Sequence, residues 1–319
     1  MKKIVGARAS TILYNTLMAN KGKFSNGKFI LPANICPIVP LTLLKAGVFF
    51  EFLDISPETQ CMRPEEIYSH INRSPDSICG IIYVHSYGFK QDLRLLFSSL
   101  RERYHQIFLI DDQCTCIPDT IGVSVLSKAN LTLFSTGYAK FVEFGSGGFG
   151  YLGDSTDYIE SKEVFLDTAH QKLVKKISSS LEECAPFAYI DSPWLIMSAG
   201  IKEEKYFKDI ESQIPVVHSH KKKINNIYAN IIPGEYHMGE NFSWRFNIQV
   251  PDKQRILNKI YESGLFASSH YKSVANIFGN QPSPVANHFH SHMINLFNDY
   301  RFTEDMALQV GTIVKRALK

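Results

Sequence analysis

The sequence has no long apolar run, no zinc-type cysteine pairs and no secretion signal. No apolar stretch approaches the about 20 residues that a membrane-spanning helix needs, and the basic N-terminus 1–6 lacks the apolar run of a signal peptide. Its six cysteines form no pair of pairs, and Cys114 and Cys116 lie too close together for an ordinary structural disulfide. These absences predict a cytoplasmic protein with reduced thiols, without membrane contact and without a resident metal ion.

Neither sign of charge dominates the chain. It has 34 lysines and arginines against 31 aspartates and glutamates, a formal net charge of +3. Its basic clusters, 172–176 and 221–223, lie in segments of helical character, where a solvated helix face is a plainer interpretation than a nucleic-acid surface. We therefore expect a small charged ligand and no nucleic acid. With 319 residues, 45% of them hydrophobic, the chain is long enough for a large domain and a smaller one.

The first half of the chain alternates short apolar runs with amphipathic segments. Strands are predicted at 28–31, 48–52, 78–84, 107–110 and 131–135, and helices at 10–18, 39–46, 64–71 and 93–104. This alternation, with fully apolar strands, predicts an α/β fold in which helices cover both faces of a mostly parallel sheet. Ligands of such sheets bind at the carboxyl ends of the strands.

The second half changes character. Helices are predicted at 161–183, 203–231, 252–263 and 303–318, and a strand at 242–250. This mixture predicts a small C-terminal α+β domain. We place the boundary at residue 215, which gives a large domain of 1–215 and a small domain of 216–319.

Two motifs of the large domain fall where the sheet rule places ligands. The strand 108–112 runs into two carboxylates, so Asp112 is a candidate partner for a cationic ring nitrogen, a metal or a proton. The small residues of 6–10 open the first helix, where free backbone N–H groups suit a phosphate at the positive helix end. Each motif also has a plain interpretation, since acidic strand ends and simply capped helices are common.

The third motif is Lys140, which follows a Ser/Thr-rich strand end and precedes Gly145, Gly147, Gly148 and Gly150. Hydroxyls and closely approaching backbone amides suit a phosphate, and a lysine among aromatic residues can act as an amine nucleophile. An ordinary surface lysine is the alternative. Taken together, a phosphate cradle, a carboxylate and a reactive lysine are the parts of a pyridoxal-phosphate (PLP) site.

With these motifs the sequence resembles the DegT/DnrJ/EryC1/StrS sugar aminotransferases, which are fold-type I PLP-transferases. The segment 83–88 is similar to the family's "VHlyG" strand, and 111–115 stands where the family has "EDaAq". Further similar segments are 29–37, 45–48, 52–55, 134–148, 264–271 and 293–296. The resemblance covers most of the chain and implies a large PLP-binding domain with a small C-terminal domain.

The resemblance implies a role for each matching residue. Lys140 carries PLP covalently and moves protons between substrate and cofactor, and Asp112 pairs with the pyridinium nitrogen. The other cofactor contacts implied are Ser135 with the backbone amides of Ala7, Arg8 and Ala9 at the phosphate, Thr115 near the phenolic oxygen and Cys36 at the ring. Candidate substrate contacts are His270, Tyr271 and Tyr138.

The implied reaction moves an amino group from glutamate or glutamine to a keto group of a nucleotide-linked sugar, for surface-polysaccharide or amino-sugar biosynthesis. A homodimer is implied, because sites of the family are completed across a dimer interface. Two alternatives stay open. In PLP-dependent sugar dehydratases the lysine is replaced by histidine, so Lys140 argues against that chemistry. A degenerate protein of this fold, used for binding or regulation, is suggested by Thr115 and Ser146, which depart from the residues usual in the family at these positions, and by the short N-terminus.

Other conspicuous side chains have plain interpretations. We expect His85, Trp194 and Trp244 to be core residues rather than catalytic or ligand-binding ones. The alternating histidines 288, 290 and 292 lack an adjacent carboxylate or cysteine, so they predict a solvated strand or loop rather than a metal site.

Overall fold

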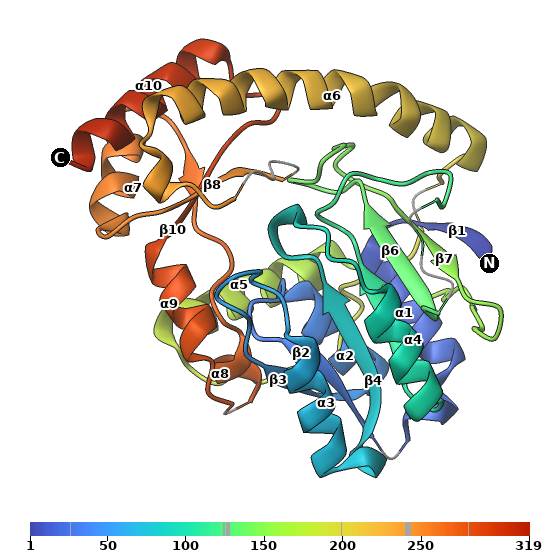
Figure 1. Cartoon of the computed structure of the whole chain (residues 1–319). Coiled ribbons are helices and arrows are strands. Elements are labelled where there is room, and N and C mark those ends of the chain that lie inside the picture. Colours follow the sequence, from blue (N-terminus) through green and yellow to red (C-terminus); the bar gives the residue numbers. More distant parts are fainter. Residues whose placement is uncertain (26, 124, 126–127, 199, 240–243, 280) are drawn as a thin grey trace.

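A seven-stranded sheet forms the centre of the large lobe (Figure 1). The computed structural model describes residues 1–319 except 26, 124, 126–127, 199, 240–243 and 280. In spatial order the strands are β1 (Lys2–Gly6), β7 (Gly148–Leu152), β6 (Leu131–Ser135), β5 (Phe108–Asp112), β4 (Ile78–Val84), β2 (Lys28–Pro32) and β3 (Phe49–Leu53). The five strands from β6 to β3 run parallel, and β7 is antiparallel to both neighbours. The predicted mostly parallel α/β sheet is confirmed.

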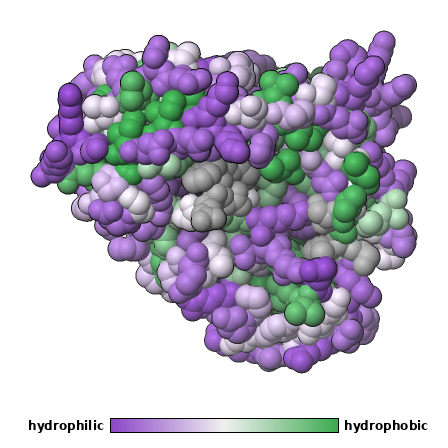
Figure 2. Space-filling model, turned by 45° about the horizontal axis from the view of Figure 1, so that its top comes forward, coloured by the Kyte–Doolittle hydropathy of each residue, from purple (hydrophilic) through white to green (hydrophobic). Residues whose placement is uncertain are grey.

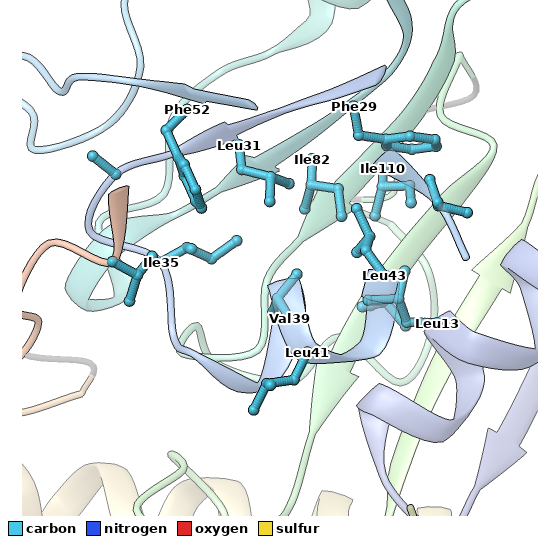
Figure 3. Packing of buried hydrophobic residues seen from close by; sticks show 14 of the residues in the cluster. Leu13, Phe29, Leu31, Ile35, Val39, Leu41, Leu43, Phe52, Ile82 and Ile110 are labelled. Atoms are coloured by element: carbon cyan, nitrogen blue, oxygen red, sulfur yellow. The ribbon is translucent and has the colours of Figure 1, made fainter. Parts of the chain in front are cut away.

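Helices cover both faces of this sheet. Their bounds are α1 (Ala9–Ala19), α2 (Ile38–Ala46), α3 (Pro64–Arg73), α4 (Arg94–Arg103), α5 (Asp167–Glu183) and α6 (Glu203–Ile231). On one face α1 and α2 bury Leu13 and Leu43 against strand residues such as Phe29 and Ile110 (Figure 3). On the other face α3 and α4 bury Ile67 and further apolar residues against β2, β4 and β5. These two packed layers hold the carboxyl ends of the strands in fixed positions.

Two strands of the large sheet were not predicted, β1 and β7. The sequence of β7 is Gly-Phe-Gly-Tyr-Leu, and glycine lowers the preference for a strand. The structure gives the reason for both glycines: a Cβ at Gly148 would lie 2.4 Å from the amide nitrogen of Ala9, and one at Gly150 would lie 2.6 Å from the carbonyl oxygen of Thr132. Close backbone approach therefore outweighs strand preference here.

The predicted helix 161–183 is wrong at its start, because α5 begins only at Asp167. The residues before it follow an irregular path alongside α1. The side-chain amides of Asn15 in α1 and of Asn20, which follows it, bind this path: Asn20 Nδ2 donates to the carbonyl of Asp157 at 2.9 Å, and Asn15 Oδ1 accepts the amide of Ser161 at 3.1 Å. These bonds compete with the hydrogen bonds of a helix.

The small lobe contains an antiparallel sheet of β8 (Phe246–Gln249), β10 (Met293–Leu296) and β9 (Ala267–Ser268). Its helices are α7 (Lys253–Glu262), α8 (Ala275–Phe278), α9 (Pro284–His292) and α10 (Glu304–Ala317). The predicted α+β character is confirmed, while residues 242–243 of the predicted strand lie outside the described residues. The histidine run 288–292 is helical, in α9, so the expected strand or loop is wrong; Pro284 at the first position starts this helix.

The helix α6 crosses the proposed domain boundary without interruption. Its first turns bury Tyr206 and Phe207 against β6 and β7, and its last turns bury Ile224 and Tyr228 in the core of the small lobe. Figure 1 shows α6 running from the side of β6 and β7 to α10. A division at Pro215 thus falls inside one helix, and it stays a prediction.

The surface is mostly hydrophilic on the face drawn in Figure 2, with hydrophobic patches between the polar residues. Among the residues that the structure describes, no helix is both long enough and apolar enough to cross a membrane.

Candidate active site

The predicted site residues come from the ends of neighbouring strands. Cys36 follows β2, Asp112 ends β5, Ser135 ends β6, and Lys140 lies five residues further on. Tyr87 lies in the turn that follows β4. Because β2, β4, β5 and β6 are parallel neighbours, their carboxyl ends meet along one edge of the sheet.

Two buried thiols lie close enough to both Lys140 and Asp112 to interact with them electrostatically. Burial raises the pKa of Cys36, and this thiol also interacts electrostatically with the Lys140 ammonium, which lowers its pKa, and with the Asp112 carboxylate. Burial raises the pKa of Cys114 well above its usual value, and the Cys114 thiol also interacts electrostatically with Asp112 and Lys140. Cys36 follows β2 and Cys114 follows β5, so segments from two different strands lie near both the Lys140 ammonium and the Asp112 carboxylate. Lys140 itself is half-buried.

The neighbouring carboxylates Asp111 and Asp112 point to opposite faces of β5, as successive strand residues do. Asp111 accepts from His85 Nε2 at 2.7 Å and from Gln113 Nε2 at 2.7 Å. The other ring nitrogen of His85 accepts the amide of Gln91 at 2.9 Å, so His85 is a buried, fully bonded core residue, as expected. Asp112 accepts the amide of Cys114 at 2.9 Å and is the carboxylate on the Lys140 side.

The backbone next to Lys140 is held by hydrogen bonds, whereas the Lys140 amine has no bonding partner among the described residues. Ala139 has a φ of +56°, in the left-handed region. Its amide donates to Glu143 Oε2 at 2.9 Å, and its carbonyl accepts from the indole Nε1 of Trp244. The Lys140 Nζ makes no hydrogen bond or ion pair with any residue that the structure describes. This amine is therefore available for a reaction.

An anion cradle lies beside this turn. A Cβ added at Gly137 would lie 3.3 Å from Arg8 Nη1 and 3.4 Å from Ser135 Oγ, so a guanidinium and a hydroxyl converge on a glycine. Ser135 Oγ accepts the amide of Gly137 at 3.2 Å, which leaves its own proton to donate. Arg8 Nη1 donates to the carbonyl of Gly145 at 2.6 Å, which leaves the other guanidinium N–H groups for an anion. This donor set fits a phosphate group.

The start of α1 packs against the glycine segment that leads into β7. Arg8 pairs with Gly147, whose amide donates to the carbonyl of Ala7 at 2.8 Å, and the Ala9 amide lies against Gly148 in β7. The roles given to the amides of Ala7, Arg8 and Ala9 stay predictions. Ser10, which was not selected, has an amide in the first turn of α1 with no partner among the described residues. Its place in the first helical turn was the available signal.

Aromatic side chains of both lobes pack together beside the turn that carries Lys140. The ring of Trp244 stacks on Tyr271 with centroids 5.8 Å apart, and Tyr87 and His270 lie 6.0 and 5.9 Å from the same indole. Tyr271 interacts electrostatically with Cys36 and Asp112. Tyr87 and Trp244 were not predicted to border the site; Trp244 is buried as expected but also faces the pocket.

The remaining predicted residues lie at the margins. Burial, helped by Arg245 and Lys140, lowers the pKa of His270 to about 4, so its ring is neutral at pH 7. Tyr138 is 71% exposed, and its ring centroid lies 6.0 Å from Arg8 Cζ. Thr115 Oγ1 donates to the carbonyl of His85 at 2.8 Å and accepts the amide of Gly88, so its partners are backbone groups and its role at a cofactor stays a prediction.

Trp194 is fully buried, as expected for a core residue. No group of three or more histidine, cysteine, aspartate or glutamate side chains that could hold a metal ion occurs within the described part of the chain.

Comparison with known proteins gives the fold. No family model and no curated protein matches the sequence. A DegT DnrJ EryC1 StrS aminotransferase from Brucella abortus matches with 13% identity over 100% of this chain and 86% of its own, at a TM-score of 0.69. A Streptococcus pneumoniae protein named as a sugar aminotransferase, solved in its PLP form, matches with 15% identity over 100% and 88%, at a TM-score of 0.71. DesI, crystallised in the presence of its TDP-sugar product, matches with 14% identity over 100% and 81%, at a TM-score of 0.72.

At these identities the comparisons show the fold alone. The chain has the fold-type I architecture of the DegT/DnrJ/EryC1/StrS sugar aminotransferases along its whole length. The predicted fold class is confirmed.

Proposed function

We propose that this chain is a PLP-dependent aminotransferase that moves an amino group from glutamate or glutamine to a keto group of a nucleotide-linked sugar. The observation that carries the proposal is that Lys140 and Asp112 both lie close to the thiols of Cys36 and Cys114, with Arg8 and Ser135 converging on Gly137 beside them. The fold of sugar aminotransferases, one of them crystallised with its TDP-sugar product, supports the substrate class.

Each residue has a task that follows from its surroundings. PLP, when bound, supplies an aldehyde that captures amines and a ring that stores the electrons released at the substrate carbon. With PLP present, the unpaired amine of Lys140 would hold it through this aldehyde and would move a proton at the substrate carbon. Asp112 would keep the ring nitrogen protonated, and Arg8 with Ser135 would hold the phosphate. The neutral ring of His270 can form a hydrogen bond with substrate without adding charge to the site.

The decisive experiment adds PLP to the purified protein and follows the visible absorbance of lysine-linked PLP. We expect wild type to develop this absorbance and Lys140→Ala to lack it. Lys90→Ala, which removes an exposed lysine near His85, is the matched control and keeps the absorbance. Borohydride reduction followed by peptide mass spectrometry locates the modified lysine. Wild-type protein without a band, or PLP attached elsewhere, contradicts the proposal.

The two alternatives make different predictions. A binding or regulatory protein of this fold holds PLP but does not convert it to the pyridoxamine form when glutamate is added, whereas an aminotransferase does. A dehydratase of the related type carries histidine in place of the lysine, and the free amine of Lys140 argues against it. We also propose that the protein is cytoplasmic and forms a homodimer. Sedimentation of the PLP form tests the homodimer.

A further inference from the structure

A chain of ion pairs connects the turn that carries Lys140 to the small lobe. Glu143, three residues after Lys140, receives two hydrogen bonds from Arg301, at 2.9 Å from Nη1 and 2.7 Å from Nη2. The Glu143 side chain is 6% exposed and that of Arg301 is 44% exposed. Two parallel bonds between a guanidinium and a carboxylate fix direction as well as distance.

The series of ion pairs continues into the core of the small lobe. Arg301 Nε donates to Asp299 Oδ1 at 3.1 Å, and Asp299 Oδ2 accepts from Arg245 Nη1 at 2.7 Å. The Arg245 guanidinium lies 3.5 Å from the centroid of the Phe297 ring, and both side chains of the Asp299–Arg245 pair are buried. Removing one member of a buried pair leaves an uncompensated charge, so the Asp299–Arg245 pair is costly to break.

A second connection also runs from the small lobe to the turn that carries Lys140. Trp244, adjacent to Arg245, donates its indole N–H to the carbonyl of Ala139. The carbonyl of Trp244 accepts from the buried Lys221 Nζ at 2.8 Å. Ala139 thus has its carbonyl bonded to Trp244 and its amide bonded to Glu143, both of which are fixed by the small lobe.

We propose that Glu143, Arg301 and Trp244 are positioning residues that set the direction of the Lys140 amine, so that the small lobe controls how PLP is captured. None of the three bonds the amine; they act through Ala139, whose φ of +56° is an unfavourable conformation for alanine and persists only where neighbouring bonds impose it. The inference rests on the proposed function for its link to PLP.

The test compares Arg301→Gln with wild type, Arg301→Lys and Arg255→Gln. Arg255 is the matched control, because it lies in the small lobe, is 51% exposed and pairs with Asp252 at 3.2 Å, away from Glu143. In protein without PLP, peptide mass spectrometry measures how fast an amine-acylating reagent modifies Lys140. After PLP is added, the rate of the visible absorbance measures capture.

We expect Arg301→Gln to change the two rates in opposite directions. The released amine reaches solvent more often, so acylation becomes several-fold faster, while capture of PLP becomes about tenfold slower because the amine is no longer held in one direction. Arg301→Lys restores part of both rates, and Arg255→Gln matches wild type. Thermal unfolding checks that each variant is folded.

Equal rates in wild type and Arg301→Gln overturn the inference, as does a variant in which both rates fall together. A wild type that captures no PLP overturns the proposed function, but the acylation comparison then still decides whether Arg301 directs the lysine. The two failures are therefore distinguishable.

Discussion

At the scale of single residues, neighbouring side chains on one strand have separate tasks. Asp111 is engaged by His85 and Gln113, and Asp112 faces Lys140. The alternation of a strand is enough to separate a carboxylate that stabilises the core from one that faces the pocket. The proposed function therefore depends on Asp112 far more than on Asp111.

Asp112→Asn and Asp111→Asn make this separation measurable. For Asp112→Asn we expect PLP to attach to Lys140 but the conversion by glutamate to slow by about 10²–10³-fold, a size typical of losing one preorganised electrostatic contact. Asp111→Asn places an amide N–H against a donor of His85 or Gln113, so it lowers the unfolding free energy by about 1–3 kcal/mol. Stopped-flow absorbance and urea unfolding measure the two effects. The same loss of rate in both variants contradicts the assignment.

The sequence could predict the residues that follow strands but not those that reach the site from elsewhere. Lys140, Asp112 and Ser135 follow apolar runs, so the sheet rule places them at one edge. Trp244 and Arg301 lie more than 100 residues away along the chain, and nothing in their local sequence indicates that they contact the turn at Ala139. Tertiary folding alone brings them there.

At the scale of elements, the strands β4 and β2 lie in unusually close contact at one point of the sheet. Gly80 lies where a Cβ would be 2.3 Å from Cε1 of Phe29. Phe29 is fully buried. It makes an edge contact with Phe24 at a centroid distance of 5.0 Å and a tilted contact with Phe108 at 6.3 Å. The ring has little room to move, so the packing at this point requires glycine.

Gly80→Ala is expected to lower the unfolding free energy by about 1–3 kcal/mol, because the added methyl group overpacks the core. Phe29→Leu in the same chain removes the ring atoms nearest to the methyl group. The double variant is therefore more stable than the sum of the single variants predicts. Urea unfolding of all four proteins gives the coupling; strict additivity shows that the two residues do not compete for space.

Apolar strands were predictable as elements, whereas β7 and the start of α5 were not. An apolar run such as 78–84 specifies a buried strand through its own composition. The strand β7 depends on the backbone of α1, which its glycines approach, and the segment before α5 depends on Asn15 and Asn20. Such elements depend on residues that are distant in the sequence, so the local sequence pattern does not predict them.

At the scale of the whole molecule, a buried cation affects how stability depends on pH. Burial, with Arg245 nearby, lowers the pKa of Lys221 from 10.5 to about 7. Its ammonium is bonded to Trp244 and Asn298. Between about pH 7 and pH 10 the unfolded chain holds a proton at this lysine that the folded chain has lost. The contribution of Lys221 to the unfolding free energy therefore rises with pH in that window and is constant below it.

Lys221→Met removes this titration. We expect the unfolding free energy of wild type minus that of the variant to rise between pH 7 and pH 9, by up to about 1.4 kcal/mol per pH unit. Lys222→Met, at the exposed neighbouring position, is the control, and its difference from wild type stays flat. Urea unfolding at pH 6, 7, 8 and 9 provides the comparison. A flat difference for Lys221→Met as well shows that the amine keeps its ordinary pKa.

The long helix α6 belongs to both halves of the molecule, and this restricts how the halves can move. Pro215 has no N–H, so one hydrogen bond is missing from the helix near its midpoint, and the ring separates neighbouring turns. A bend of this helix is easiest near that proline, because the turns on either side keep their hydrogen bonds. Trp244 and Arg301 bond the turn that carries Lys140, so a bend that moves the C-terminal half away from the sheet has to break these bonds.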